Sequence, residues 1–247
     1  MVFLYLMGTA EKIVNKIESM IEGTTFSYRE LPIATCEYSA ATKAIERLLK
    51  RGIINRASTG LFYKPKQTAF GKLRPSEEDL LKPYLFKNGK RVAYITGIAL
   101  YNKLGLTTQI PKDIRVASRD RRIITKVGNI KVKAVKSYSD VNDENYYLME
   151  LLDVLKDFKI IPDTDKIQVI RFMLQKFKKL TVKEKNTILE IVFNYPPRVR
   201  AFTGALFNEL NPDSPEMKLK ESINPLSIFE FGLDKAFLKF IDFWNIR

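Results

Sequence analysis

The first 66 residues show an order of short elements that few small folds accommodate. Three stretches with apolar residues at helical spacing precede two short β runs around a turn that contains glycine. In chain order, the elements are a helix after the N-cap Thr9, a short helix over 28–31, a helix from Ser39 to Arg51, and β runs at 53–56 and 61–64. Three small helices followed by a hairpin is the order found in a winged helix-turn-helix, and we predict that fold for residues 1–66.

In such a fold the third helix enters the DNA major groove and the hairpin lies beside the backbone. This use requires small, polar or cationic side chains on the outer face of the helix. The candidate DNA-binding residues are Ser39, Thr42, Lys43 and Arg47 on the helix, and Arg56, Ser58, Thr59, Lys64 and Lys66 on or after the hairpin. The same fold also serves as a protein-interaction module, and Glu46 on the outer face favours that alternative.

The formal net charge of +14 is concentrated in the middle of the chain. Residues 1–66 hold 10 basic and 6 acidic side chains, residues 67–140 hold 16 and 6, and residues 141–247 hold 16 of each. A localised surplus is typical of a protein that binds a polyanion, most often nucleic acid. A solubilising surface without a ligand is the competing interpretation.

Residues 67–140 predict a small basic α+β domain. Helices are expected after Ser76 and after Thr96 as N-caps, and strands at 92–95, 113–118, 123–127 and 130–135. Alternation places Lys126, Lys131 and Lys133 on a solvated strand face. The turn between the strands at 113–118 and 123–127 is different, because its closely spaced cations are well placed to hold phosphates. Those cations, Arg119, Arg121 and Arg122, complete the candidate DNA-binding set.

The last segment, residues 141–247, predicts a helical domain. Helices are expected at about 144–158, 163–178, 183–193, 198–210 and 233–244, and prolines separate several of them. Their apolar spacing predicts a packed bundle without a polar constellation. The carboxylate pairs Asp153 and Asp157, and Asp163 and Asp165, are interpreted as capping or exposed groups rather than metal ligands. The predicted fold class is therefore α+β in three parts.

The absence of histidine argues against most catalytic chemistry. With no histidine and one cysteine, the chain offers no plausible zinc site and no imidazole base. It also lacks the glycine-rich phosphate-loop and dinucleotide fingerprints. A nuclease using carboxylate-bound Mg²⁺ remains as a weak alternative, because no spaced acidic set accompanies the basic segment. We expect a non-enzymatic protein with no cofactor and no bound metal.

Two further features bear on the compartment. The single cysteine, Cys36, fits a reducing cytoplasmic compartment, because it cannot form an internal disulfide. No apolar run approaches the roughly 18 residues that a membrane span requires. We therefore expect a cytoplasmic protein without a membrane partner.

Two stretches carry a resemblance to a known family. They are the helix-to-hairpin stretch from Ala44 to Tyr63, AIERLLKRGIINRASTGLFY, and the stretch from Gly97 to Pro111, GIALYNKLGLTTQIP. Together they resemble the DUF6088 family, related to the AbiEi-type antitoxins of abortive-infection systems, over about residues 10–140.

This resemblance implies a bacterial antitoxin and transcriptional repressor that binds double-stranded DNA. Such a repressor recognises inverted repeats in the operator of its own operon and is encoded beside a nucleotidyltransferase-like toxin. The recognition helix would be Ser39 to Arg51 and the wing Asn55 to Lys64. The domain after the wing would support toxin neutralisation. A homodimer is compatible with operator repeats, and the helical last third has no aligned counterpart.

Overall fold

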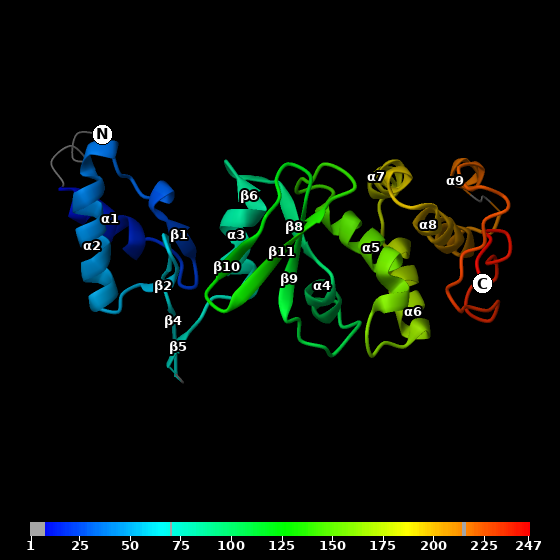
Figure 1. Ribbon diagram of the computed structural model, residues 1–247, viewed down its shortest axis with the longest axis horizontal. Helices are drawn as coiled ribbons and strands as arrows, with labels where there is room; N and C mark the ends of the chain where they lie inside the picture. The colour runs from blue at the N-terminus through cyan, green and yellow to red at the C-terminus, as the bar shows by residue number, and fades with distance from the viewer. Residues whose placement is uncertain (1–7, 70, 214–215) are drawn as a thin grey trace. The chain divides into compact units, whose positions relative to one another are not determined.

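A computed structural model describes residues 8–69, 71–213 and 216–247 (Figure 1). The described residues form nine α-helices, short 3-10 turns and four small β-sheets, which confirms the predicted α+β class. The chain divides into two compact units. Unit 1 holds residues 1–85 and 125–131, and unit 2 holds residues 86–124 and 132–247. The division into 1–66, 67–140 and 141–247 stays a prediction.

Unit 1 begins with alternating helices and short strands. Its first elements are α1 (Thr9–Glu18), β1 (Thr25–Ser27), 3-10 turns at Tyr28–Glu30 and Thr35–Glu37, α2 (Tyr38–Lys50), β2 (Asn55–Ser58) and β3 (Leu61–Tyr63). The strands form an antiparallel sheet in the order β1-β3-β2, with Thr25 opposite Tyr63. The sequence analysis missed β1, because three residues are too few to show an alternating pattern.

The core of unit 1 lies between α1, α2 and this sheet. The helices bury one stripe each, with Ile13 and Ile17 on α1 and Ile45 on α2 fully inaccessible to solvent. They pack against Phe26 and Phe62, whose ring centroids lie 5.9 Å apart. Burying one face of an amphipathic helix fixes its opposite face toward solvent. The packing therefore determines which α2 side chains are exposed.

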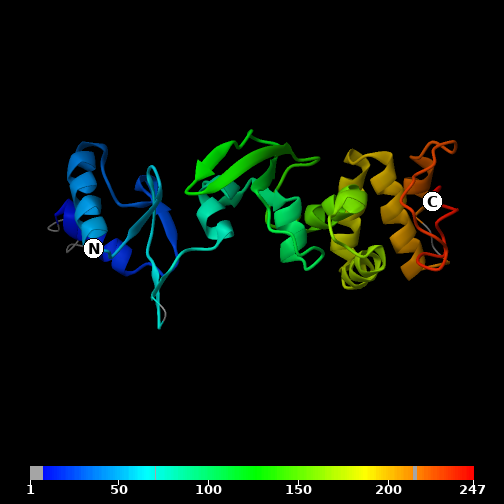
Figure 2. The ribbon, with the colours of Figure 1, turned by 60° about the horizontal axis from the view of Figure 1, so that its bottom comes forward.

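The remainder of unit 1 follows this sheet. It comprises the hairpin β4 (Lys66–Thr68) and β5 (Gly71–Leu73), helix α3 (Glu77–Leu85) and strand β10 (Thr125–Val127). Both ribbon views show the β4–β5 hairpin extending away from the three-stranded sheet (Figures 1 and 2). The Ser76 hydroxyl accepts a hydrogen bond from the Asp79 amide at 3.1 Å, as an N-cap does. The Thr25 hydroxyl donates to the Asp79 carbonyl at 2.7 Å and so attaches α3 to β1.

Unit 2 opens with strands and a short helix. They are β6 (Phe86–Lys87), β7 (Lys90–Arg91), β8 (Ala93–Thr96), α4 (Ile98–Lys103), β9 (Asp113–Ser118) and β11 (Ile130–Lys136), which begins in unit 1. The strand order is β10-β11-β9-β8, and β9 has the predicted bounds. The predicted alternation is also confirmed, since Val127 and Val132 are buried while Lys126, Lys131 and Lys133 are exposed.

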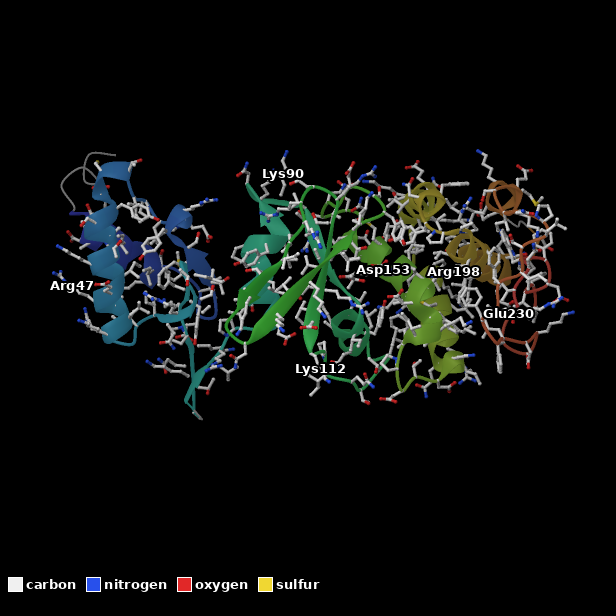
Figure 3. All side chains as sticks on the ribbon, viewed as in Figure 1. Arg47, Lys90, Lys112, Asp153, Arg198 and Glu230 are labelled. Carbon is white, nitrogen blue, oxygen red and sulfur yellow. The ribbon has the colours of Figure 1, made fainter. Side chains whose placement is uncertain are left out.

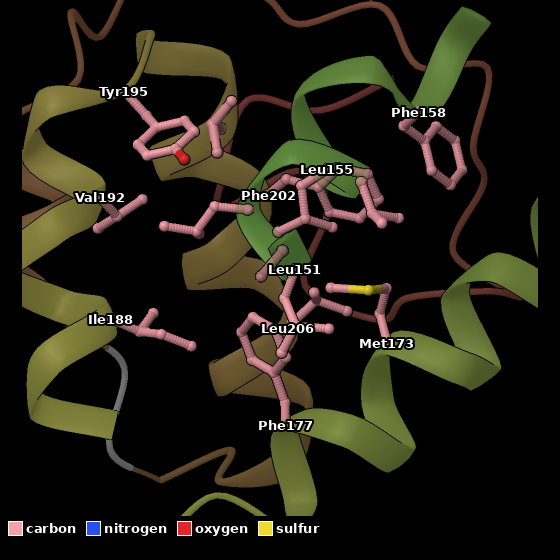
Figure 4. Packing of buried hydrophobic residues seen from close by; sticks show 14 of the residues in the cluster. Leu151, Leu155, Phe158, Met173, Phe177, Ile188, Val192, Tyr195, Phe202 and Leu206 are labelled. Atoms are coloured by element: carbon pink, nitrogen blue, oxygen red, sulfur yellow. The ribbon is translucent and has the colours of Figure 1, made fainter. Parts of the chain in front are cut away.

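The helical part of unit 2 contains α5 (Tyr146–Asp157), a 3-10 turn at Phe158–Ile160, α6 (Lys166–Lys178), α7 (Val182–Ile191), a 3-10 turn at Val192–Asn194, α8 (Pro197–Leu210) and α9 (Met217–Glu221). The first four predicted helices are confirmed. Figure 4 shows their apolar side chains converging, among them Leu151, Met173, Ile188 and Phe202. Asp165 caps α6 by accepting from the Ile167 amide at 2.9 Å, as its interpretation as a capping group required.

The predicted helix at 233–244 is wrong. The chain there forms successive turns, with the Phe237 amide donating to Asp234 and the Trp244 amide donating to Ile241, each at 3.0 Å. Separate turns can bring apolar residues to one side at the same spacing as a helix, so the pattern misled the prediction. The Trp244 ring lies so close to Gly204 that an added Cβ would be 2.2 Å from its Cη2 atom.

The expectation that the helical region lacks a polar constellation is also wrong. Asp153 on α5 is 1% exposed rather than solvated. Its carboxylate accepts hydrogen bonds from the Thr96 hydroxyl at 2.6 Å and the Tyr94 hydroxyl at 2.9 Å, and it pairs with Lys156 at 2.7 Å. A buried charge requires such partners, and here the two hydroxyl groups come from β8 and the ammonium from α5 itself.

This network connects β8 and α4 to α5. The Tyr101 hydroxyl on α4 donates to Asp157 at 2.8 Å. Burial, together with the nearby aspartates, raises the pKa of Tyr94 and Tyr101 far above the usual tyrosine range, so both stay protonated. Thr96 is not the predicted N-cap of α4. Gly97 holds that position with a φ of 72°, which favours glycine, and the Thr96 side chain is directed to Asp153 instead.

Candidate nucleic-acid interface

The start of α2 is held in place by Glu37. Its carboxylate accepts hydrogen bonds from the Thr9 hydroxyl at 2.7 Å and the Ala34 amide at 3.0 Å, joining α1 to the turn before α2. These donors hold the pKa of Glu37 below its usual value. The predicted N-cap Ser39 is wrong by two positions, because the 35–37 turn leads directly into the helix at Tyr38. Ser39 lies in the first helical turn and is exposed.

The outer face of α2 presents two cations one helical turn apart. Lys43 and Arg47 are exposed, and within the described residues neither side chain makes a hydrogen bond or an ion pair. Figure 3 shows Arg47 on the side of α2 turned away from the small sheet. Thr42 is half-buried and its hydroxyl donates to the Tyr38 carbonyl at 2.9 Å. Glu46 is also exposed on this helix, as expected from the sequence.

The β2–β3 hairpin carries the next group of candidates. Its register shifts between Arg56 and Ser58, and Gly60 adopts a φ of 73° in the turn. Arg56 is exposed and its guanidinium carbon lies 5.7 Å from the centroid of the Phe62 ring on the neighbouring strand. Thr59 is exposed at the turn and Ser58 is half-buried. The hairpin therefore displays one cation and two hydroxyl groups.

Two lysines after the hairpin differ in their surroundings. The Lys64 ammonium donates to the carbonyls of Glu18 at 2.7 Å and Met20 at 2.8 Å, where α1 ends. A cation at a helix C-terminus satisfies carbonyls that have no helical partner. Lys64 thus has a structural contact that phosphate binding would have to compete with. Lys66 is exposed at the start of β4.

The predicted basic turn of unit 2 lies beside a hairpin that the sequence analysis missed. Arg119 is half-exposed, 3.8 Å from the Asp140 carboxylate, and Arg121 donates to the Phe86 carbonyl at 3.5 Å. Arg122 is exposed. A cavity of about 390 Å³ in this region is lined by residues that include Arg119 and the hairpin lysines Lys87 and Lys90.

The signal for this hairpin was present in the sequence. Asn88 and Gly89 have φ angles of 51° and 76°, which suit a tight two-residue turn, and Asn-Gly is its preferred dipeptide. Recognising that turn would have added Lys87 and Lys90 to the candidate set. Lys87 forms an ion pair with Asp120 at 3.2 Å, with both side chains about half-exposed.

The candidate residues of the two units are thus cations and hydroxyl groups, which can contact an anion. Across the residues that the structure describes, no group of three or more histidine, cysteine, aspartate or glutamate side chains could hold a metal ion. In the same residues, no helix has the length and apolar character to cross a membrane.

Comparison with known proteins places the chain among its relatives. The model of DUF6088, a family of unknown function, matches residues 12–189. The chain belongs to the DUF6088 family. The predicted family is therefore confirmed, whereas its relation to AbiEi-type antitoxins stays a prediction. No curated protein matches this DUF6088 member.

A solved structure has a similar fold. It is the crystal structure of the RV2827C protein from Mycobacterium tuberculosis, with a TM-score of 0.51 and 10% sequence identity. The match covers 90% of this chain and 85% of that chain. At this identity the likeness concerns the fold alone.

Proposed function

We propose that unit 1 is a winged helix-turn-helix that binds double-stranded DNA, and that the protein acts as a transcriptional repressor of antitoxin type. The order of elements supports the first part. Helix α1, strand β1, two short turns, helix α2 and the β2–β3 hairpin follow one another, and β1 pairs with β3 in one sheet. In this assignment α2 is the recognition helix and β2–β3 is the wing.

The observation that carries the proposal is the outer face of α2. Lys43 and Arg47 are exposed and unengaged within the described residues, while the opposite stripe of the helix is buried. Cations without intramolecular partners are free to contact base edges or phosphates at no cost in native ion pairs. Ser39 and Thr42 add small polar groups near the start of the same helix, where base contacts concentrate.

The remaining assignments follow from this role. Arg56 and Thr59 of the wing, with Lys66, would contact the backbone, and Arg119, Arg121 and Arg122 of unit 2 would add sequence-independent phosphate contacts. Binding to operator inverted repeats would use a homodimer, because protein and DNA symmetry match. The partner gene would encode a nucleotidyltransferase-like toxin, and the site of action would be the bacterial cytoplasm.

A second candidate function is a protein-interaction module without sequence-specific DNA binding. Glu46 favours it, because an exposed carboxylate on the same helix as Lys43 and Arg47 repels phosphate. The two candidates differ in salt dependence. Duplex DNA binding weakens steeply with salt as counterions are released, by a log–log slope of about 0.9 per phosphate contact.

The test uses fluorescence anisotropy with a labelled duplex from the region upstream of the gene. We expect Lys43→Ala and Arg47→Ala each to weaken binding by about 5- to 150-fold, the range for losing a base-reading cation worth about 1–3 kcal/mol. Lys16→Ala on α1 is the matched control, because Lys16 is exposed in the same unit. Equal affinity of all three variants, each with a native circular dichroism spectrum, would assign the α2 face to another role.

A further inference from the structure

Unit 2 contains a groove that the DNA-binding proposal does not use. The cavity has a volume of about 400 Å³. One wall is formed by the end of α5, the turn that follows it and the start of α8, and includes Lys159, Ile160 and Arg198. The other wall is a stretch of chain at residues 228–231. Both walls belong to the same compact unit.

The 228–231 stretch makes one isolated parallel bridge, at Phe229, to the chain at Ile246. The Phe229 amide donates to the Asn245 carbonyl at 2.7 Å, and the Arg247 amide donates to the Phe229 carbonyl at 2.9 Å, in a parallel bridge. Successive residues of a strand direct their amides and carbonyls to opposite edges. Ile228 and Glu230 therefore face the other edge, and within the described residues their backbone groups make no hydrogen bond.

Aromatic rings pack beneath the groove, and exposed apolar side chains lie on both of its walls. Phe231 is 2% exposed, and its ring centroid lies 4.8 Å from that of Phe202 and 5.9 Å from that of Phe158. By contrast, Ile160 and Ile228 on the two walls are 67% and 50% exposed. Large apolar side chains exposed around a concavity are typical of an interaction site.

The charges of the groove favour an acidic occupant. Lys159 is exposed and has no ion pair within the described residues. Arg198 is exposed too, and it donates only to the Lys156 carbonyl, at 3.4 Å. The Lys156 charge is neutralised by Asp153 at 2.7 Å. Asp157 on the same wall is 12% exposed and accepts a hydrogen bond from the Tyr101 hydroxyl at 2.8 Å. The exposed charges of the groove are therefore those of Lys159 and Arg198 on this wall and of Glu230 on the other.

We propose that this groove binds an extended peptide segment of a partner protein, which adds as a strand along residues 228–230. The free backbone groups of Ile228 and Glu230 supply the main-chain hydrogen bonds of β-augmentation. An apolar side chain of the peptide lies between Ile160 and Ile228. A carboxylate two residues away along the same face meets Arg198 and Lys159. The proposal does not depend on DNA binding by unit 1.

The experiment begins with selection of random peptides of about a dozen residues, displayed on phage, against the immobilised full-length chain. Enriched peptides are synthesised with a fluorophore and titrated by anisotropy. We expect alternating apolar residues flanked by aspartate or glutamate. Ile160→Asp and Ile228→Asp should each weaken binding at least about tenfold. Val182→Asp is the matched control, because Val182 on α7 is also an exposed apolar residue, at 78%.

Two measurements distinguish strand addition from other modes. N-methylation along the peptide should abolish binding at alternate positions only, because every second amide of a strand points to the same edge. Arg198→Glu should weaken binding of the selected peptide. A peptide with lysine in place of its acidic residue should bind that variant more tightly than the selected peptide does.

Hydrogen exchange gives an independent view of the chain itself. The amides of Ile228 and Glu230 should become protected when the peptide binds, while that of Phe229 is already bonded to Asn245. Failure to enrich any peptide overturns the proposal. So do peptides that bind both wall variants as tightly as the native chain, and so does an N-methyl pattern without a period of two.

Discussion

Units 1 and 2 use their basic residues in different ways. In unit 1 the outer face of α2 presents Lys43 and Arg47 without partners among the described residues. In unit 2 many cations are paired. The ion pairs there include Lys87 with Asp120, Arg91 with Asp143, Arg119 with Asp140, Lys133 with Asp113, Lys156 with Asp153 and Asp157, Lys183 with Glu144, Lys185 with Glu216 and Lys235 with Asp242.

The comparison shows that the net charge of a segment does not indicate which of its cations lack an ion-pair partner. The segment 67–140 has the largest basic surplus, yet several of its cations have local partners. Arg91 is the clearest case, because it pairs with Asp143 at 3.0 Å and its guanidinium lies 3.8 Å from the centroid of the Tyr146 ring. Exposed pairs contribute only about 0–1 kcal/mol each, so phosphate could still displace them at little cost. Buried pairs differ in this respect.

The largest effect is expected where unit 2 buries its charge. Asp153→Ala leaves Lys156 without its closest partner, and the Lys156 side chain is only 12% exposed. Breaking a buried pair from one side costs about 3–5 kcal/mol of unfolding free energy. Trp244, the single tryptophan, is fully buried in unit 2, so its fluorescence follows the unfolding of that unit in urea.

Two further measurements test the difference between buried and exposed ion pairs and the independence of the two units. The control Asp242→Ala removes the pair with Lys235, in which both side chains are 66% exposed, and should change stability by less than about 1 kcal/mol. DNA affinity of Asp153→Ala, measured where the protein is folded, should match the native value. A loss of affinity would show that the two units do not work independently.

A smaller effect is expected from the basic turn of unit 2. Changing Arg119, Arg121 and Arg122 together to glutamate should weaken binding to all duplexes alike, by about tenfold or more. The log–log salt slope should fall by about 0.9 for each phosphate that the variant no longer neutralises. Sequence preference should stay the same, because phosphate contacts do not read bases.

The matched control for total charge is on α6 and the residue after it. Changing Lys176, Lys178 and Lys179 to glutamate alters the net charge by the same amount, and all three are exposed. If both triple variants lose affinity equally, long-range attraction rather than local contact explains the effect. If neither changes the slope, the basic turn serves a purpose other than DNA binding.

Local patterns predicted the elements that have a regular spacing of apolar residues over their own length. Strand β9 has the predicted bounds, and the stripe of Ala41, Ile45 and Leu48 on α2 is buried as expected. Strand β1 was missed because its three residues are defined by pairing with β3. The turns at 233–244 have helical spacing only because Leu238, Ile241 and Trp244 all face the same core.

The sequence predicted which residues of the candidate site are exposed, but not which of them make contacts within the protein. The exposure of Lys43, Arg47 and Arg56 agrees with the sequence pattern. The contacts of Lys64 with the end of α1 span more than 40 residues of sequence, and no local pattern encodes them. Asp153 gave no local signal of its burial, because it lies at helical spacing from Glu150 and Asp157 on a face that appears polar in the sequence.

The smallest predicted effect concerns the carboxylate that fixes α2 in unit 1. Hydrogen bonds from the Thr9 hydroxyl and the Ala34 amide lower the pKa of Glu37 in the folded chain. In the unfolded chain a glutamate has a pKa of about 4.3. The carboxylate therefore stabilises unit 1 fully above about pH 4.3, and this contribution is lost as the pH falls through the lower folded value.

Hydrogen exchange of the α1 and α2 amides, corrected for intrinsic rates, measures this loss between about pH 6 and pH 3. Glu37→Gln has no titrating group at this position, so its protection should depend less on pH than that of the native chain. Because Glu37 orients α2, we also expect the variant to bind DNA slightly more weakly near neutral pH. An identical pH profile for both proteins would mean that the contact between α1 and the start of α2 does not hold α2 in place, and that apolar packing alone positions Lys43 and Arg47.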